Sequence, residues 1–116
     1  MTDGTHDQLQ VAFPASPTFT RIGRVAVVGL ALRLGLDVST VEKLRTAVDS
    51  AVSALQGSGR ISAHASWTPT ELQITLSNPE ADVEERNSLS AELSELVGQA
   101  SVESTQVTLT LETEPE

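Results

Sequence analysis

Apolar and polar residues alternate along four stretches of the chain, and this alternation predicts four short β-strands. In the first stretch Leu9, Val11 and Phe13 lie on one side of the strand, and Pro14 ends it. The second and third stretches are joined by Thr-Pro-Thr, so they are expected to form a hairpin. Each strand has a single apolar side, which favours a sheet with one covered and one open face. The predicted strands span residues 9–14, 61–67, 72–77 and 107–112.

Elsewhere the apolar residues recur every three or four positions, which predicts three helices. Ser16 can cap the first helix with Pro17 at its first position, and Gly35 can end it. This helix is apolar over much of its circumference, so we expect it to be packed on more than one side. Ser39 and Glu42 have the spacing of a capping box at the start of the second helix. The predicted helices run from Ser16 to about Leu34, from Ser39 to about Gly57 and from about Ser88 to Gly98.

The predicted elements follow the order β-α-α-β-β-α-β, which favours an α/β (α+β) two-layer sandwich. We expect a mainly antiparallel four-stranded sheet with three helices on one face, the other face being exposed or covered by a partner. The pattern leaves the strand order open. The length of 116 residues suits one domain, expected over residues 8–112, with a disordered tail at 1–7 and an acidic tail at 113–116.

Composition narrows the classes of partner and chemistry. Seven basic and 16 acidic residues give a net charge of −9, which disfavours a nucleic-acid or anionic-membrane surface. Aromatic residues make up 3% of the chain, too few to build stacking platforms for bases. There is no cysteine, which excludes disulfides and thiolate chemistry. The apolar run 25–32 is too short to span a bilayer and residues 1–10 are polar, so we expect a cytoplasmic protein.

Three stretches of the sequence resemble one protein family. The run FPASPTFTRIGRVAVVGLALRLGLDVSTVEKLRTAVDSAVSAL is similar to the N-terminal half of the bacterial anti-sigma-factor serine kinases of the RsbW and SpoIIAB type. ELQITLSNPE resembles their strand into an aspartate-glycine loop, and SLSAELSELVGQASVESTQVTLTLE resembles their last helix and strand. The resemblance covers about residues 9–112 and rests mainly on the order of the elements. It implies the GHKL, or histidine-kinase-like, ATPase fold.

The resemblance also implies a set of catalytic positions, and this sequence departs from the family at each of them. In the family a helix glutamate serves as the base and an asparagine one turn later holds Mg²⁺, whereas Ser50 and Ala54 stand at those positions here. Asn78 and Pro79 replace the loop whose aspartate recognises adenine. The short polar segment that follows has no glycine and replaces the phosphate lid. The resemblance therefore implies a degenerate site with no catalytic residue, no metal and no ATP or other cofactor.

Five other features have simpler explanations than a catalytic role. Asp49 is one residue from the base position, about 100° around the helix, and is expected to be a solvated charge. His64 falls on the polar side of a strand and Trp67 at a hairpin end, so a surface histidine and a core plug are expected. The acidic run 80–85 is expected at a helix N-terminus. Residues 57–60, Gly-Ser-Gly-Arg, are expected to form a turn rather than a phosphate-binding loop.

Three functions fit these features. The first, which the resemblance implies, is a catalytically inactive ATPase-fold module that binds a sigma factor or a STAS-domain antagonist in bacterial sigma-factor regulation. Arg21 and Arg24 of the first helix, and the open side of the sheet, are its candidate partner surfaces. The second is an active serine kinase with Asp49 or Glu80 as a substitute carboxylate. The third is an unrelated small α/β structural or dimerisation domain, and a homodimer would fit the first function as well.

Overall fold

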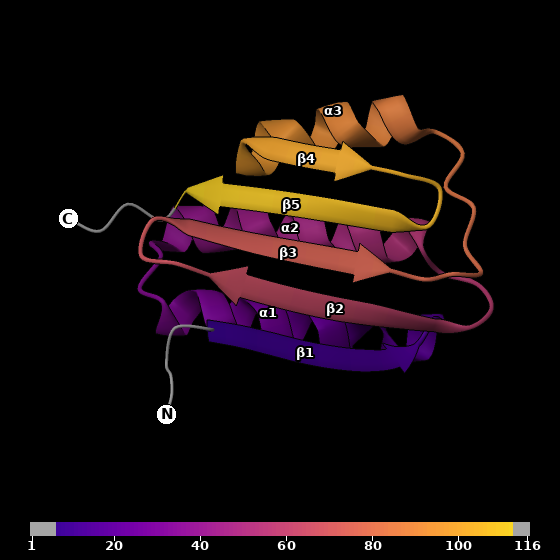
Figure 1. Cartoon of the computed structure of the whole chain (residues 1–116), viewed down its shortest axis with the longest axis horizontal. Helices are drawn as coiled ribbons and strands as arrows, with labels where there is room; N and C mark the ends of the chain where they lie inside the picture. The colour runs from indigo at the N-terminus through magenta and orange to yellow at the C-terminus, as the bar shows by residue number, and fades with distance from the viewer. Residues whose placement is uncertain (1–6, 113–116) are drawn as a thin grey trace.

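The computed structural model describes residues 7–112, which form one antiparallel sheet with a layer of helices behind it (Figure 1). The strands lie in the order β1-β2-β3-β5-β4, and each neighbouring pair is antiparallel. The strands are β1 (Asp7–Pro14), β2 (Arg60–Trp67), β3 (Glu71–Ser77), β4 (Gln99–Val102) and β5 (Gln106–Glu112). The helices are α1 (Thr20–Arg33), α2 (Val38–Ala54) and α3 (Arg86–Val97), and a 3₁₀ turn, η1 (Pro17–Phe19), precedes α1.

The sheet has five strands rather than the predicted four, because β4 was not recognised in the sequence. This strand has only four residues and follows Gly98 directly, so it offers no alternation long enough to detect. Its two apolar residues lie on the covered side of the sheet, Ala100 opposite Leu109 and Val102 opposite Val107. The α+β class, the antiparallel sheet and the three helices on one face are confirmed.

The start and end of α1 follow the expected signals with one difference. The Ser16 hydroxyl accepts a hydrogen bond from the Thr18 N–H at 3.3 Å, but the turn that it caps is η1. The α-helix itself begins only at Thr20. Gly35 follows the end of the helix with a positive φ of 84°, a conformation that glycine adopts without strain, so the predicted stop is confirmed.

The predicted capping box at the start of α2 is wrong. Asp37 is the capping residue, with extended backbone and a side chain that accepts a hydrogen bond from the Thr40 N–H at 2.8 Å. Ser39 instead lies within the first turn of the helix. Hydrogen bonds from the side chain and the backbone N–H of Thr40 hold the pKa of Asp37 below its usual range, since they favour the ionised carboxylate.

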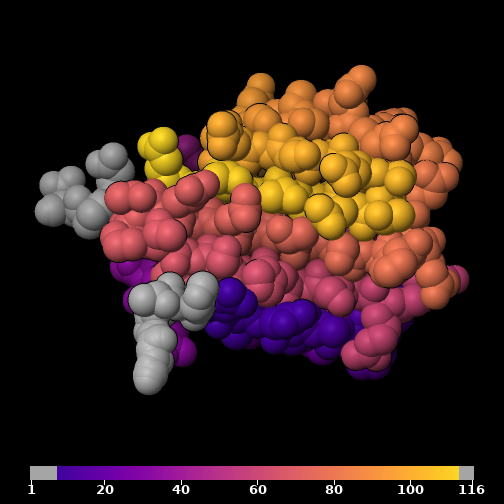
Figure 2. Space-filling model, in the orientation of Figure 1, coloured from indigo at the N-terminus to yellow at the C-terminus, as the bar shows by residue number. Residues whose placement is uncertain are grey.

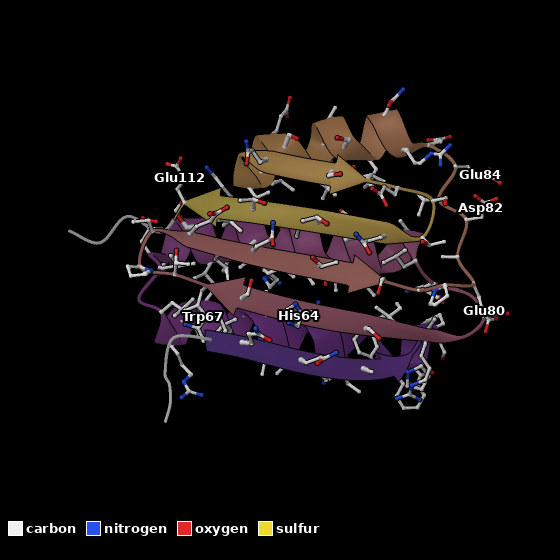
Figure 3. The ribbon with its side chains drawn as sticks, viewed as in Figure 1. His64, Trp67, Glu80, Asp82, Glu84 and Glu112 are labelled. Atoms are coloured by element: carbon white, nitrogen blue, oxygen red, sulfur yellow. The ribbon has the colours of Figure 1, made fainter. Side chains whose placement is uncertain are left out.

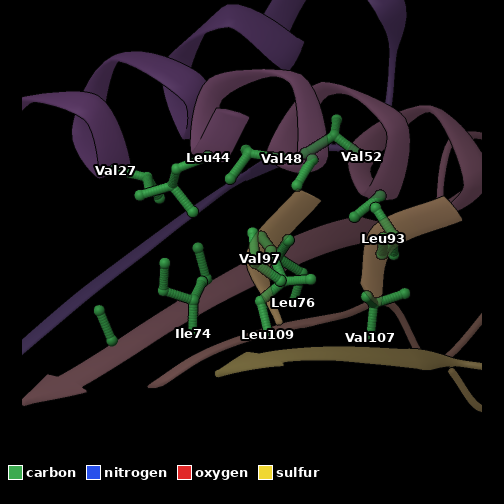
Figure 4. Packing of buried hydrophobic residues seen from close by; sticks show 14 of the residues in the cluster. Val27, Leu44, Val48, Val52, Ile74, Leu76, Leu93, Val97, Val107 and Leu109 are labelled. Carbon is green, nitrogen blue, oxygen red and sulfur yellow. The ribbon is translucent and has the colours of Figure 1, made fainter. Parts of the chain in front are cut away.

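The hydrophobic core fills the space between the helices and the covered face of the sheet (Figure 4). Helix α2 occupies the middle of the helical layer and contacts both α1 and α3. Leu44 and Val48 of α2 are fully buried, as are Ile74 of β3 and Leu109 of β5. Phe13 is the only buried aromatic residue among residues 7–112, so the core is otherwise aliphatic.

The other face of the sheet is polar and is the face seen in Figure 2. One register row crosses all five strands through Gln10, His64, Thr75, Thr108 and Ser101. These side chains are amides, hydroxyls and an imidazole rather than apolar groups, so the expected open, polar face is confirmed.

The predicted tails, 1–7 and 113–116, lie outside the described residues apart from Asp7, which begins β1. Within residues 7–112, none of the helices is long and apolar enough to cross a bilayer.

Candidate functional site

Ser50 and Ala54 lie on the flank of α2 that faces α3. The Ser50 hydroxyl donates a hydrogen bond of 2.9 Å to a carboxylate oxygen of Glu92 on α3. Ala54 is partly buried one turn further along and shares a surface hollow with Leu89 and Glu92 of α3. The flank that the family resemblance assigns to base and metal ligand is therefore in direct contact with a neighbouring helix.

The hollow beside Ala54 has a volume of about 440 Å³ and an acidic lining. The loop before α3 and the first turns of α3 supply its carboxylates, and Figure 3 shows Asp82 and Glu84 on that loop. Among residues 7–112, no Lys, Arg or His lines it, so its field disfavours an anionic ligand such as a triphosphate. The lining residues are Ala54, Asp82, Val83, Glu84, Glu85, Ser88, Leu89 and Glu92.

Asn78, at the position of the family's adenine loop, is fully buried and hydrogen-bonded within the chain. Its side-chain nitrogen donates to the backbone carbonyls of Leu55 at 2.8 Å and Ser58 at 2.9 Å. Its side-chain oxygen accepts from the Glu80 N–H at 3.0 Å. These bonds join the end of α2, the turn before β2 and the loop after β3, so this amide supports the backbone and presents no free group to a ligand.

Asp49 lies on the flank of α2 that faces α1, where it meets Arg24 of α1. The Arg24 guanidinium and the Asp49 carboxylate form an ion pair of 3.2 Å, with both side chains partly exposed. Asp49 is thus ion-paired rather than only solvated, and it does not share the flank of Ser50. Of the two arginines predicted as a partner surface, Arg24 is held by this pair, while Arg21 is exposed on α1.

The remaining candidate residues have structural surroundings. His64 lies on the open face with its Nε2 atom 3.1 Å from the Gln8 side-chain oxygen. Trp67 is partly buried and packs against the edge of the core. Of residues 57–60, the first three form a bend before β2 and Arg60 begins the strand. Within residues 7–112, no three His, Cys, Asp or Glu side chains are grouped so as to hold a metal ion.

The acidic run 80–85 was expected at a helix N-terminus, and its last residue, Glu85, is the N-cap residue of α3. The rest of the run forms a loop before the helix, and Glu85 makes no side-chain cap bond. Two tertiary contacts explain the loop: Val83 is buried, and its N–H donates to the Ser104 carbonyl at 2.8 Å.

The exposed apolar side of α1 was not identified from the sequence, although the first helix was a candidate partner surface. The helix packs against both α2 and β1, as expected, yet Val25 and Leu32 are 60% and 57% exposed. The apolar pattern itself was the available signal, but the pattern does not reveal which side lacks a neighbour. Among residues 7–112 no element covers this side of α1.

Comparison with known proteins shows a similarity over part of the chain. No protein-family model matches the chain. Serine-protein kinase RsbW of Listeria monocytogenes and that of Listeria innocua are each 33% identical to it over 48 residues. The chain is similar in part to RsbW serine-protein kinases. The aligned residues make up 41% of this chain and 31% of each RsbW chain, and the family resemblance noted in the sequence agrees with this match.

Proposed function

We propose that this chain is a catalytically inactive module with an ATPase-derived fold, which binds a protein partner and does not bind ATP. The observation that carries the proposal is the Ser50–Glu92 hydrogen bond. It joins α3 to the flank of α2 on which the family resemblance places the base and the metal ligand. Ser50 is a poor base at neutral pH and Ala54 has no atom that can ligate Mg²⁺, so both parts of phosphoryl transfer that the family needs are absent at these positions.

The charge around the hollow supports the same conclusion. It is lined by Asp82, Glu84, Glu85 and Glu92, with no cation from the described part of the chain. ATP, by contrast, carries several negative charges and is held by cationic groups and Mg²⁺. Asn78 adds to this argument, because its three side-chain hydrogen bonds go to the backbone of the chain itself.

The alternative of an active kinase requires a substitute carboxylate. Asp49 is paired with Arg24 on the α1 side, and Glu80 is an exposed residue of the loop after β3. The Asp49 side chain is directed to α1 while that of Ser50 is bonded to α3, so we give this alternative second place. An unrelated dimerisation domain is the third candidate, and the partial similarity to RsbW favours the first function over it.

The similarity to RsbW also suggests the class of partner. We propose a role in sigma-factor regulation of the partner-switching type, with a sigma factor or a STAS-domain antagonist as partner and Arg21 on the contact surface. Proteins encoded beside this chain are the first to test by calorimetry, in the absence of nucleotide.

Titration of the purified chain with Mg²⁺-ATP tests the central claim. We expect no heat of binding and no rise in melting temperature. The double variant Ser50→Glu/Ala54→Asn, which restores the family's residue types, is the matched control and is also expected not to bind, because the acidic hollow remains. Micromolar ATP affinity of the unmodified chain, or phosphate transfer to a STAS-domain protein, would overturn the proposal.

A further inference from the structure

The solvent side of α1 is apolar, the reverse of an ordinary surface helix. Ile22, Val25 and Leu32 are 41%, 60% and 57% exposed, and Gly29 lies between them. At about 100° per residue these four positions fall within an arc of about 80°. We call them the α1 outer face; the buried residues of the helix, such as Val27, lie on the opposite side.

The charges of α1 are also unlike those of the rest of the chain. The helix carries three of the seven basic residues and none of the 16 acidic ones. Arg21 and Arg33 are exposed near the two ends of the α1 outer face, and neither forms an ion pair within residues 7–112. The third, Arg24, points toward α2 and pairs with Asp49. The α1 outer face is therefore an apolar strip with an unpaired arginine near each end.

We infer that the α1 outer face binds an amphipathic helix of a partner protein whose apolar stripe is bordered by acidic residues. The inference rests on the proposed protein-binding function and specifies its partner. Burial of Val25 and Leu32 supplies a hydrophobic driving force, and Gly29, with open space around its Cα, allows a second helix to approach closely. Arg21 and Arg33 then select acidic groups at both ends.

Other occupants fit less well. A second copy of α1 on this face would place arginines against arginines without a carboxylate on either helix. An anionic membrane would attract the arginines, but the chain's net charge of −9 would oppose its approach. The same net charge and the exposed aliphatic side chains argue against a nucleic acid.

The test uses two synthetic helical peptides of about 18 residues, or five turns, with the same leucine stripe. One has glutamates and the other has lysines along the border of the stripe. By titration calorimetry at low salt we expect the glutamate peptide to bind about tenfold more tightly, the value for two exposed charge contacts. The preference should shrink at about 0.5 M salt, because exposed charges are screened.

Variants locate the binding surface. The variant Arg21→Glu/Arg33→Glu should reverse the preference between the two peptides. The variant Val25→Ser/Leu32→Ser should lower the affinity for both of them. The matched control Lys43→Glu/Arg86→Glu makes the same change in net charge on α2 and α3 and should leave the preference intact. Circular dichroism checks that each variant is folded.

Three results would overturn the inference: equal affinity for the two peptides, NMR shift changes centred outside α1, or binding to anionic phospholipid vesicles at the same protein concentration. The outcome is separable from the proposed function. ATP binding would contradict the proposed function without changing the peptide preference, whereas equal peptide affinities would contradict only the present inference.

Discussion

The two flanks of α2 differ in how their polar groups are used. On the α3 side, Ser50 is bonded to Glu92, and residues 80–95 contain six carboxylates and one arginine. At the end of α2, Asn78 is buried and makes three hydrogen bonds to the backbone. On the α1 side, one ion pair links the two helices, and beyond it α1 presents exposed aliphatic residues and arginines. On the flank where the family resemblance places catalysis, Ser50 is hydrogen-bonded within the chain. The apolar residues that lack a covering element lie on the other side of the helical layer, on α1.

The two flanks therefore differ in what they contribute. The α3 side joins α2 to α3, and Ser50 and Ala54 there are neither the carboxylate nor the amide that the family resemblance implies. On the α1 side, Val25 and Leu32 contribute little to the core and remain largely exposed to solvent. Substitutions on one flank at a time can therefore test whether the α3 side contributes mainly to stability and the α1 side mainly to binding.

The largest effect is expected from Asn78→Ala, at the end of α2. The change leaves the carbonyls of Leu55 and Ser58 and the N–H of Glu80 without their partner in a buried region. We expect a loss of about 3 kcal/mol in the free energy of unfolding, measured by urea denaturation.

Two variants sharpen this test. Asn87→Ala, at an exposed position of α3, should change stability very little. Asn78→Asp restores the family's residue but removes the donor groups, so it should also destabilise the fold and should not create ATP binding. A fully stable Asn78→Ala protein would contradict the structural role of this amide.

Two glycines of α1 lie on different sides of the helix, Gly23 on the inner side and Gly29 on the outer side. A Cβ atom at Gly23 would lie 2.8 Å from the buried Phe13 ring, whereas a Cβ atom at Gly29 would meet nothing within 4 Å. We expect Gly23→Ala to cost about 1–3 kcal/mol through overpacking. Gly29→Ala should add about 0.5–1 kcal/mol, because alanine favours the helix. Equal effects in thermal denaturation would contradict the assignment of the two sides.

The start of α2, which both flanks share, gives a prediction on pH. Because the pKa of Asp37 is lowered in the folded state, the unfolded chain binds this proton more readily. The stabilisation by the cap is therefore present at neutral pH and is lost as the pH falls through the folded pKa, below about 4.

Thermal melts of two variants measure the cap. Asp37→Ala should lower the melting temperature by a few degrees at pH 7. Asp37→Asn keeps a capping oxygen without a titrating group, so it should retain most of the stability and lose this part of the pH dependence. An identical acid response in Asp37→Asn and the unmodified chain would contradict the role of Asp37.

Much of the fold was predictable because its elements are long enough to show their period. The hairpin of β2 and β3 alternates over most of its length, and the core side of α2 repeats every three or four residues. The elements that the sequence did not predict were either short or dependent on tertiary contacts. β4 has four residues, and the loop at 80–85 is held by the bond from Val83 to Ser104 across the fold.

The candidate site was predictable only in part. Helical spacing placed Ser50 and Ala54 on one flank, and both do face α3. It did not identify Glu92, which is 42 positions from Ser50 in sequence and is brought to it only by the packing of α3 on α2. The exposure of Val25 likewise depends on which elements surround α1, and a local pattern does not contain that information.

The smallest expected effects come from the two polar links that join α2 to its neighbours. Arg24–Asp49 is a partly exposed ion pair, and Ser50–Glu92 is an exposed hydrogen bond to a carboxylate. Double-mutant cycles to alanine should give a coupling of about 0.5 kcal/mol for each. The first coupling should fall in high salt more than the second, because it alone joins two full charges. A much larger coupling at Ser50–Glu92 would mean that this bond itself, rather than the burial of Leu93 and Val97, holds α3 against α2.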